Sequence, residues 1–417
     1  MTPTGPTTLS QTLIAHVADW LMRQALEETD IERVVMGCCE RLRAAGIPLT
    51  RGYFAFPTLH PLHNAIGITW SDGVGTTVAN YPHVPGGVSD SYRRSPHYYM
   101  FERDLDFMRI RLDGNERTYK FPVLEELREA GVRDYIAFGV RLQGPSTMGL
   151  LGSWATNHID GFSDEAIAAL LRVRDRLAVA CLMAIKNALM TNITRTYLGT
   201  GTGCNVLSGQ IKRGDGESID AIIWHADIRG STQMADSGEH QAYIDALNAF
   251  FEVMGGPIKD AGGDILSFSG DSLLALFRPT GDDQRPGEVM TRVFDAARDA
   301  VAQMETLNAD RVAKGENEIG YGIGLHCGTV TYGNVGTPER LSFSVFGASV
   351  NEVARLEKLT RDLGEKIVVS ETAAALAPLP LVDRGTHPLR GVGRDMRVFT
   401  PDDGDTSGKV VKLDRSA

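Results

Sequence analysis

The chain has 417 residues, of which 23% are charged and 42% are hydrophobic, and its formal net charge is −11. This length is large for one hydrophobic core, so we expect two domains of ordinary soluble composition. The negative charge argues against nonspecific binding to nucleic acid or to an anionic membrane. It still allows a local basic pocket for a phosphorylated small molecule.

Cysteine content and hydropathy indicate the compartment. The five cysteines show no CxxC spacing, which argues against a disulfide framework or a zinc ribbon and favours a reducing environment. No run approaches the roughly 18 uncharged apolar residues of a membrane span. The N-terminus lacks the basic start and apolar core of a signal peptide. The sequence therefore predicts a cytoplasmic protein with no membrane segment.

The first part of the chain reads as a helical segment followed by a sheet. Residues 1–8 are expected to be disordered, and residues 9–46 show helical periodicity. Residues 51–158 alternate strand-like stretches such as "YFAFPTL" and "MGLLGSWAT" with polar loops. This order resembles small-molecule-sensing domains of the GAF type. We therefore expect an α/β regulatory domain over residues 1–160.

Residues 161–217 are predicted to connect two domains. A helix over 163–192 begins with Ser163 as its N-cap and carries an apolar stripe through Leu170, Val173, Leu177 and Met183. Two interpretations of this stripe remain open. The helix either packs on its own domain or pairs with a second copy as a signalling helix. Residues 197–217 are Gly-rich and polar, which predicts a linker.

A second domain is predicted from residue 218 to 400, followed by a flexible tail over 401–417. Its apolar periodicity changes between strand-like and helix-like in the order βαββαβ, which predicts a ferredoxin-like α/β sandwich with helices over one face of an antiparallel sheet. The expected elements are a strand at 218–228, a helix at 238–255, a hairpin at 262–277, a helix at 286–312, a strand at 319–327, a helix at 348–360 and a strand at 366–370.

Two aspartates lie at strand ends of this domain. Asp227 follows the first strand and Asp271 lies in the hairpin turn, and either alone could be an ordinary cap or turn residue. In a βαββ arrangement the first strand and the hairpin are neighbours, so the two carboxylates can meet. Paired carboxylates suit Mg²⁺ or Mn²⁺, which completes its shell with phosphate oxygens. The segment "IRGST" after Asp227 would present free backbone N–H groups to a polyphosphate.

Asn351 and Arg355 form a second pair. They lie one turn apart on one face of the predicted helix at 348–360. An amide and a guanidinium so placed can bind a ribose oxygen and a phosphate together.

Four ordered motifs indicate a family. "ADIRGST", "GGDILSFSGDSLLALF", "GIGLHCGTVTYGNVG" and "FSVFGASVNEVARLEKL" closely resemble, over about residues 195–400, the catalytic domain of class III nucleotide cyclases, the adenylate and guanylate cyclase family. The resemblance implies that a ribose 3′-hydroxyl attacks the α-phosphorus of a nucleoside triphosphate and that pyrophosphate leaves, with two divalent cations assisting.

The resemblance also implies which residues form the site. A head-to-tail homodimer would hold two composite sites, with no nucleic acid and no membrane as partners. Asp227, Ile228 and Asp271 of one chain would form the metal site, and Asn351 and Arg355 of the other would bind the ribose and the α-phosphate. The triphosphate would lie along the four residues after Ile228, which are Arg229, Gly230, Ser231 and Thr232. Arg390 would take the place of the phosphate-binding lysine that is usual in the family.

The base-reading positions depart from the family. Adenylate cyclases usually have lysine at the position of Ser267 and aspartate or threonine at that of Ser344, and guanylate cyclases have glutamate at the first. A serine hydroxyl reaches several ångströms less far than lysine, so direct purine contacts are lost. Three interpretations remain open: loose use of ATP, a pocket remodelled for UTP or CTP as in pyrimidine cyclases of bacterial anti-phage signalling, and a non-catalytic nucleotide-binding module. Loss of both purine contacts favours the pyrimidine.

Overall fold

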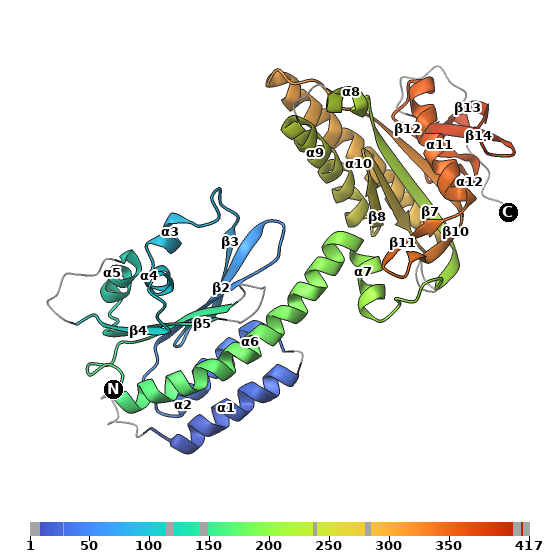
Figure 1. The fold of residues 1–417 in the computed structure, drawn as a ribbon. Coiled ribbons are helices and arrows are strands. Elements are labelled where there is room, and N and C mark those ends of the chain that lie inside the picture. Colours follow the sequence, from blue (N-terminus) through green and yellow to red (C-terminus); the bar gives the residue numbers. More distant parts are fainter. Residues whose placement is uncertain are drawn as a thin grey trace. The chain divides into compact units, whose positions relative to one another are not determined.

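The structure, a computed structural model, describes residues 9–27, 29–113, 121–141, 149–236, 240–279, 285–402 and 410–411. The chain divides into two compact units, Met1–Ile193 and Thr194–Ala417, each with its own sheet (Figure 1). The disorder expected of residues 1–8 concerns a segment outside the described residues.

Unit 1 is built on a six-stranded antiparallel sheet with the strand order β3-β2-β1-β6-β5-β4. The strands are β1 Arg51–Pro57, β2 His63–Ser71, β3 Gly75–Pro82, β4 Phe107–Arg111, β5 Asp134–Arg141 and β6 Gly149–Thr156. Alternation in β1 buries Phe54 and Phe56. The sequence did not predict β3, because most of its residues are exposed and no apolar alternation marks it.

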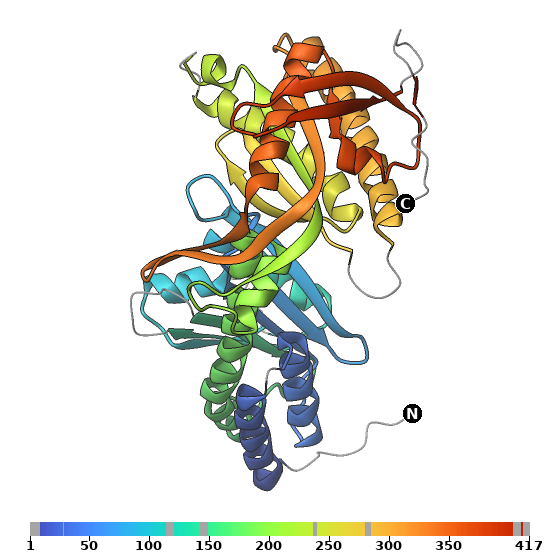
Figure 2. The same ribbon diagram turned by 90° about the vertical axis from the view of Figure 1, so that its right-hand side faces the viewer.

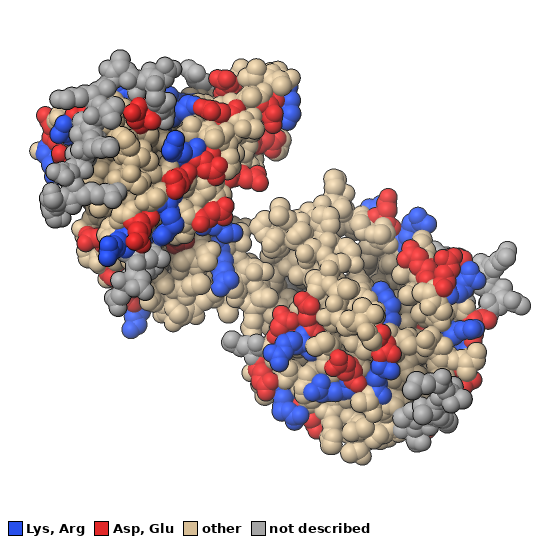
Figure 3. Space-filling view, turned by 180° about the vertical axis from the view of Figure 1, so that it is seen from behind, with Lys and Arg blue, Asp and Glu red and all other residues tan. Residues whose placement is uncertain are grey.

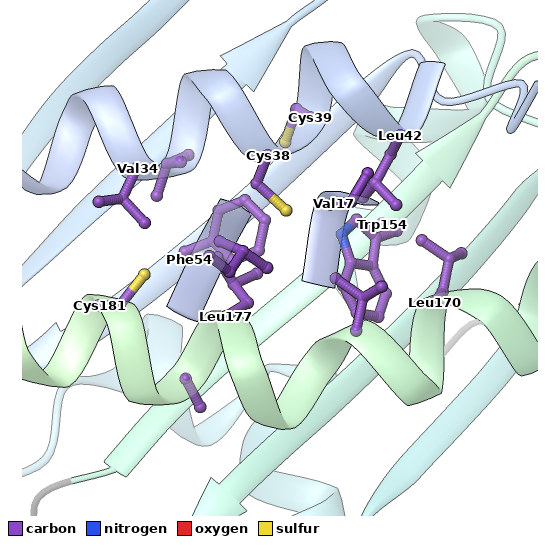
Figure 4. Packing of buried hydrophobic residues seen from close by; sticks show 14 of the residues in the cluster. Val17, Val34, Cys38, Cys39, Leu42, Phe54, Trp154, Leu170, Leu177 and Cys181 are labelled. Atoms are coloured by element: carbon purple, nitrogen blue, oxygen red, sulfur yellow. The ribbon is translucent and has the colours of Figure 1, made fainter. Parts of the chain in front are cut away.

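Helices cover both faces of this sheet. On one face, α1 Gln11–Leu26, α2 Ile31–Ala44 and α6 Asp164–Leu198 share a core with the sheet (Figure 4). On the other lie α4 Pro96–Glu102 and α5 Pro122–Glu129, with the short α3 Asp90–Arg93 before them. The helical segment at 9–46 is two helices, because the Asp30 carboxylate accepts hydrogen bonds from the N–H groups of Glu32 and Arg33 and starts α2.

The apolar stripe of α6 packs within unit 1. Leu170, Val173 and Leu177 are fully buried, whereas Met183 is 41% exposed. By length and composition α6 is long and apolar enough to cross a bilayer. In its most apolar stretch, 39% of the residues are buried in the structure.

Unit 2 contains the predicted βαββαβ core. The strands β7 Gly216–Arg229, β8 Asp264–Ser269, β9 Ser272–Phe277 and β10 Gly320–Thr337 lie in the order β10-β7-β9-β8. The helices α9 His240–Asp260 and α10 Pro286–Ala313 connect them, and the short α8 Ser231–Asp236 follows β7. β7 and β10 are long and curve together (Figure 2). β10 continues past residue 327, where the predicted strand ends, and pairs with β11 Arg340–Phe346, a strand that the sequence did not predict.

The remaining elements extend the sheet beyond β10. α11 Ala348–Leu363 leads into β12 Ile367–Ser370, which pairs with β10 in parallel. The expectation of a wholly antiparallel sheet is therefore wrong. α12 Glu371–Ala374, β13 Leu381–Pro388 and β14 Asp395–Pro401 follow. β15 Val410–Val411 pairs with β13, so the expected flexible tail contains a strand; residues 403–409 and 412–417 lie outside the described residues.

Helices lie on both faces of the second sheet, which corrects the expectation of one. α9 and α10 share a core with one face, and α11 packs on the opposite face (Figure 1). Glycines in β10 allow α11 to approach closely. The predicted linker at 197–217 also contains a helix, α7 Thr200–Leu207, attached to β8 by a hydrogen bond from the Gly201 N–H to the Asp264 carboxylate.

The face shown in Figure 3 carries charged side chains of both signs, with uncharged surface between the groups. There, the Lys and Arg side chains of both units lie among Asp and Glu side chains.

Candidate active site

The structure brings Asp227 and Asp271 together. Asp227 pairs with Ser272 across β7 and β9, and the Ile228 N–H donates a hydrogen bond to the Asp271 carbonyl oxygen over 3.3 Å. Asp271 lies in a two-residue turn with Gly270, whose φ of +63° favours glycine. Strand pairing and a tight turn therefore hold the two carboxyl groups side by side.

The electrostatics of this pair suit a divalent cation. Burial, the negative charge of Asp271 and a hydrogen bond between the two side chains raise the pKa of Asp227 to about 7. The buried Oδ1 of Asp227 has no hydrogen-bond partner among the described residues. Since an unpartnered buried acceptor beside a second carboxylate is unfavourable without a counter-charge, the arrangement fits Mg²⁺ or Mn²⁺.

A third carboxyl group lies beside the pair. Glu357 of α11 is only 5% exposed, and burial followed by the charge of Asp227 raises the pKa of Glu357 to about 7. Among the described residues no three His, Cys, Asp or Glu side chains are grouped closely enough to bind one metal ion. A cation would therefore rest on Asp227 and Asp271, with phosphate and water oxygens completing its shell.

Three ionisable residues near the aspartate pair were not predicted from the sequence: Glu357, His225 and Lys358. His225 lies two residues before Asp227, and burial followed by the positive charge of Lys358 lowers the pKa of His225 to about 4. Lys358 also opposes the negative charge of Asp227. Gly322 and Gly324, at alternate positions of β10, were the available signal, because glycines on one strand face allow a helix to approach closely.

The segment after Asp227 begins with a turn. Gly230 has a φ of +75°, and α8 starts at Ser231, followed by Thr232. The Arg229 guanidinium points elsewhere: its Nη2 donates to the Thr360 hydroxyl over 3.0 Å and to the Glu365 carbonyl oxygen over 2.8 Å. These contacts engage the Nη2 of Arg229 within its own chain, and Arg229 stays a predicted triphosphate-binding residue.

Asn351 and Arg355 lie on a different part of α11 from Glu357. Asn351 is exposed and Arg355 half-buried, and neither side chain has a hydrogen-bond or ion-pair partner within the described ranges. Asn351 precedes Glu357 by six residues, about 9 Å along a helix axis. The structure thus records no contact of either side chain with the aspartate pair of the same chain.

The two base-reading positions flank one apolar cluster. Ser267 pairs with Leu274, which packs against the cluster containing Leu266 and Phe343. Ser344 lies in β11 opposite Gly333, between two buried residues of the same cluster. Both serines are half-buried, and within the described residues neither hydroxyl has a hydrogen-bond partner.

Arg390 is exposed in the turn that follows β13. The Val392 N–H donates to the Leu389 carbonyl oxygen over 2.9 Å and closes this turn. Arg390 stays a predicted phosphate ligand.

Comparison with known families decides what this unit is. Residues 217–400 match the model of the adenylate and guanylate cyclase catalytic domain. The second unit is a class III nucleotide cyclase catalytic domain. The aspartate pair, the β8–β9 hairpin and α11 all lie inside the matched range.

Relatives of this cyclase domain include named enzymes. The chain is 34% identical over 152 residues to the adenylate cyclase of Anabaena cylindrica, covering 36% of this chain and 29% of that protein. It is 28% identical over 149 residues to adenylate cyclase 1 of Rhizobium meliloti, covering 36% of this chain and 22% of that protein. The chain thus spans less than a third of the length of these relatives.

Solved cyclase structures are similar to the same part of the chain. The guanylyl cyclase Cya2 is 25% identical with a TM-score of 0.38, and the match covers 44% of this chain and 92% of that one. The adenylyl cyclase CyaB from P. aeruginosa is 23% identical with a TM-score of 0.40, covering 48% of this chain and 98% of that one.

Proposed function

We propose that the protein converts a nucleoside triphosphate to its 3′,5′-cyclic monophosphate and pyrophosphate. The observation that carries the proposal is the juxtaposition of Asp227 and Asp271, with an unpartnered buried oxygen, inside a domain of the cyclase family. A pair of carboxylates at the end of a strand is the arrangement that divalent-cation phosphoryl transfer needs.

The residues divide the chemistry as follows. Asp227 and Asp271 would hold two Mg²⁺ or Mn²⁺ ions, and such ions would make a ribose hydroxyl more acidic and neutralise charge on phosphate oxygens. Backbone N–H groups after Asp227 face the triphosphate. The 3′-oxygen forms a bond to the α-phosphorus, the bond from the α-phosphorus to the bridging oxygen of pyrophosphate breaks, and the proton of the 3′-hydroxyl passes to water.

We infer that the active site is composite and needs a homodimer. Asn351 and Arg355 would come from the partner chain, where Asn351 orients the ribose and Arg355 stabilises charge on the α-phosphate. Two observations support this. Among the described residues neither side chain has a hydrogen-bond or ion-pair partner, and neither contacts the aspartate pair of its own chain. Side chains that bind a substrate held by another chain are expected to have no hydrogen-bond or ion-pair partner in the isolated monomer.

We propose that base selection is weak and that UTP or CTP is used at least as well as ATP. Serines at 267 and 344 supply short neutral hydroxyls where charged groups would read a purine. The alternative is an adenylate cyclase, which the similarity to the adenylate cyclase of Anabaena cylindrica favours. Competition among all four triphosphates, with products identified by mass, separates the two.

We further propose that unit 1 is a GAF-type sensor of a small molecule. Its six-stranded antiparallel sheet with helices on both faces supports this assignment. Cyclase activity measured with and without a metabolite extract of low molecular mass tests it.

A further inference from the structure

The face of β10 that packs against α11 carries almost no side chains. Alternate residues of β10 face this helix, and three of the four are glycines: Gly322, Gly324, His326 and Gly328. A Cβ added at Gly324 would lie 2.7 Å from the Val353 carbonyl oxygen. A Cβ added at Gly322 or Gly328 would lie at least as close to side-chain atoms of α11. The glycines permit close approach, yet they offer nothing that interlocks with the helix and fixes its rotation.

His326 is the exception in this row, and it joins three elements. Its Nε2 donates to the Glu352 carboxylate of α11 over 2.9 Å, and its Nδ1 lies 2.9 Å from the Ser370 hydroxyl. The Ser370 hydroxyl lies 3.0 Å from that of Thr372, which donates to the Cys327 carbonyl oxygen over 2.7 Å. This network therefore ties α11 to β10, β12 and α12.

The network has the composition of a hydrolase triad, but its burial argues against that role. Ser370 is 0% exposed and His326 is 2% exposed, so no substrate reaches the hydroxyl. The Ser370 hydroxyl also accepts the Ala373 N–H as the cap of α12. The buried contacts hold elements in place rather than carry out chemistry of their own.

Besides this network, the packing of Val350 and Val353 in the apolar cluster that contains Phe343 attaches the beginning of α11. Its N-cap, Gly347, supplies no side-chain hydrogen bond. The Ser349 hydroxyl donates to the Thr329 carbonyl oxygen over 3.0 Å. Glu352, bound to His326, directly follows Asn351 in the chain, so the network is attached next to the residue that the proposed function assigns to the ribose.

We propose that His326 and Glu352 are positioning residues that fix the rotation of α11 and thereby aim Asn351 and Arg355 at the partner chain's substrate. Side chains extend about 5–6 Å from a helix axis. A rotation of roughly 10° therefore moves their ends by about 1 Å, and such a displacement can reduce a rate on the order of 100-fold. This inference rests on the proposed cyclase activity.

The kinetic test compares substitutions at His326 with one at another buried histidine. His326→Ala is expected to lower kcat at least about tenfold while leaving KM for the triphosphate within about twofold. His326→Gln should recover part of the loss, because its amide can still donate to Glu352. His97→Gln is the matched control, since His97 is 7% exposed, lies in unit 1 and bonds to the Gly152 carbonyl oxygen over 2.9 Å; it should match the wild type.

Two kinetic outcomes would overturn the inference. One is a kcat for His326→Ala within about twofold of the wild type. The other is a His326→Gln variant as impaired as His326→Ala. Glu352→Ala should resemble His326→Ala, and the double variant should be no slower than either single variant, because both remove the same contact.

A second measurement does not depend on activity. Hydrogen exchange of the full-length dimer should be faster in His326→Ala than in the wild type at the amides of residues 348–355, and unchanged there in His97→Gln. Unchanged protection in His326→Ala would overturn the inference even if the cyclase is active. A wild type that turns over no triphosphate would instead refute the proposed function, while the exchange result still decides whether His326 holds α11.

Discussion

The Ile228 N–H donates a hydrogen bond to the carbonyl oxygen of Asp271 over 3.3 Å. This contact joins the end of β7 to the β8–β9 turn and places Asp271 beside Asp227. Two segments more than 40 residues apart in the sequence thereby supply one pair of carboxylates.

Alanine at either aspartate should abolish turnover. Asp227→Ala or Asp271→Ala removes one of the two predicted carboxylate ligands of the cations, so we expect kcat/KM to fall at least about 1000-fold, equivalent to roughly 4 kcal/mol. Asp295→Ala, on the exposed face of α10, is the matched control and should retain full activity. Circular dichroism should show an unchanged fold in all three. Full activity in Asp271→Ala would contradict the two-metal assignment.

Mixing two inactive variants should restore activity if the site is composite. Asp227→Ala and Asn351→Ala damage opposite halves, so a heterodimer retains one intact site of two. Random exchange of equal amounts should return about a quarter of wild-type activity. The measurement is turnover after mixing, with heterodimers counted by native mass spectrometry. Heterodimers without activity would show that both halves lie in one chain.

Cation binding should depend on pH near neutrality. Because the raised pKa of Asp227, about 7, leaves its carboxyl partly protonated at neutral pH, a cation must displace that proton. We expect the apparent affinity for Mn²⁺ to rise about tenfold per unit as pH increases toward 7, and to level off above it. Isothermal titration calorimetry with Mn²⁺ at pH values from about 5.5 to about 8.5 measures this affinity. An affinity independent of pH would mean that Asp227 is already ionised throughout.

The base preference should respond to the two serines. Ser267→Lys with Ser344→Asp restores charged purine contacts. One such contact is worth ~1.5–3 kcal/mol, so ATP should gain at least about ten- to a hundredfold over UTP and CTP. The measurement is the ratio of cyclic products from mixed triphosphates. If the wild type already makes cyclic AMP about a hundredfold in excess, weak base selection is wrong and the enzyme is an adenylate cyclase.

Close packing of α11 makes one glycine irreplaceable. Gly324→Ala would place a Cβ 2.7 Å from the Val353 carbonyl oxygen and 2.8 Å from the Glu357 nitrogen, both backbone atoms that cannot move alone. We expect a loss of about 1–3 kcal/mol in the free energy of unfolding. Gly256→Ala in α9 is the control, because nothing lies within 4 Å of its added Cβ, and it should stabilise. Equal melting temperatures of the two variants would contradict this packing.

Sequence periodicity could predict the βαββαβ core, because apolar residues alternate clearly in strands such as β7 and recur with helical spacing in α9. It could also predict the meeting of Asp227 and Asp271, which follows from strand order alone. It could not predict where α11 packs. Apolar periodicity does not reveal this packing, because the face of β10 under α11 consists largely of glycines; their alternate spacing was the available signal, and Glu357 beside the aspartates was missed.

The direction of the Arg229 side chain could not be predicted from the sequence either. Its position after Asp227 suggested phosphate binding, yet its partners are Thr360 and the Glu365 carbonyl oxygen, more than 100 residues later in the sequence. Local sequence fixes where a strand ends, whereas long-range packing decides which way the final side chain turns.

The central claim is tested most directly by offering the purified full-length protein all four nucleoside triphosphates together with Mn²⁺ and identifying the products by mass. The account predicts a 3′,5′-cyclic nucleotide and an equal amount of pyrophosphate from the wild type, and neither from Asp271→Ala. A folded, dimeric wild-type protein that forms no cyclic product from any of the four, with Mn²⁺ or with Mg²⁺, would contradict it.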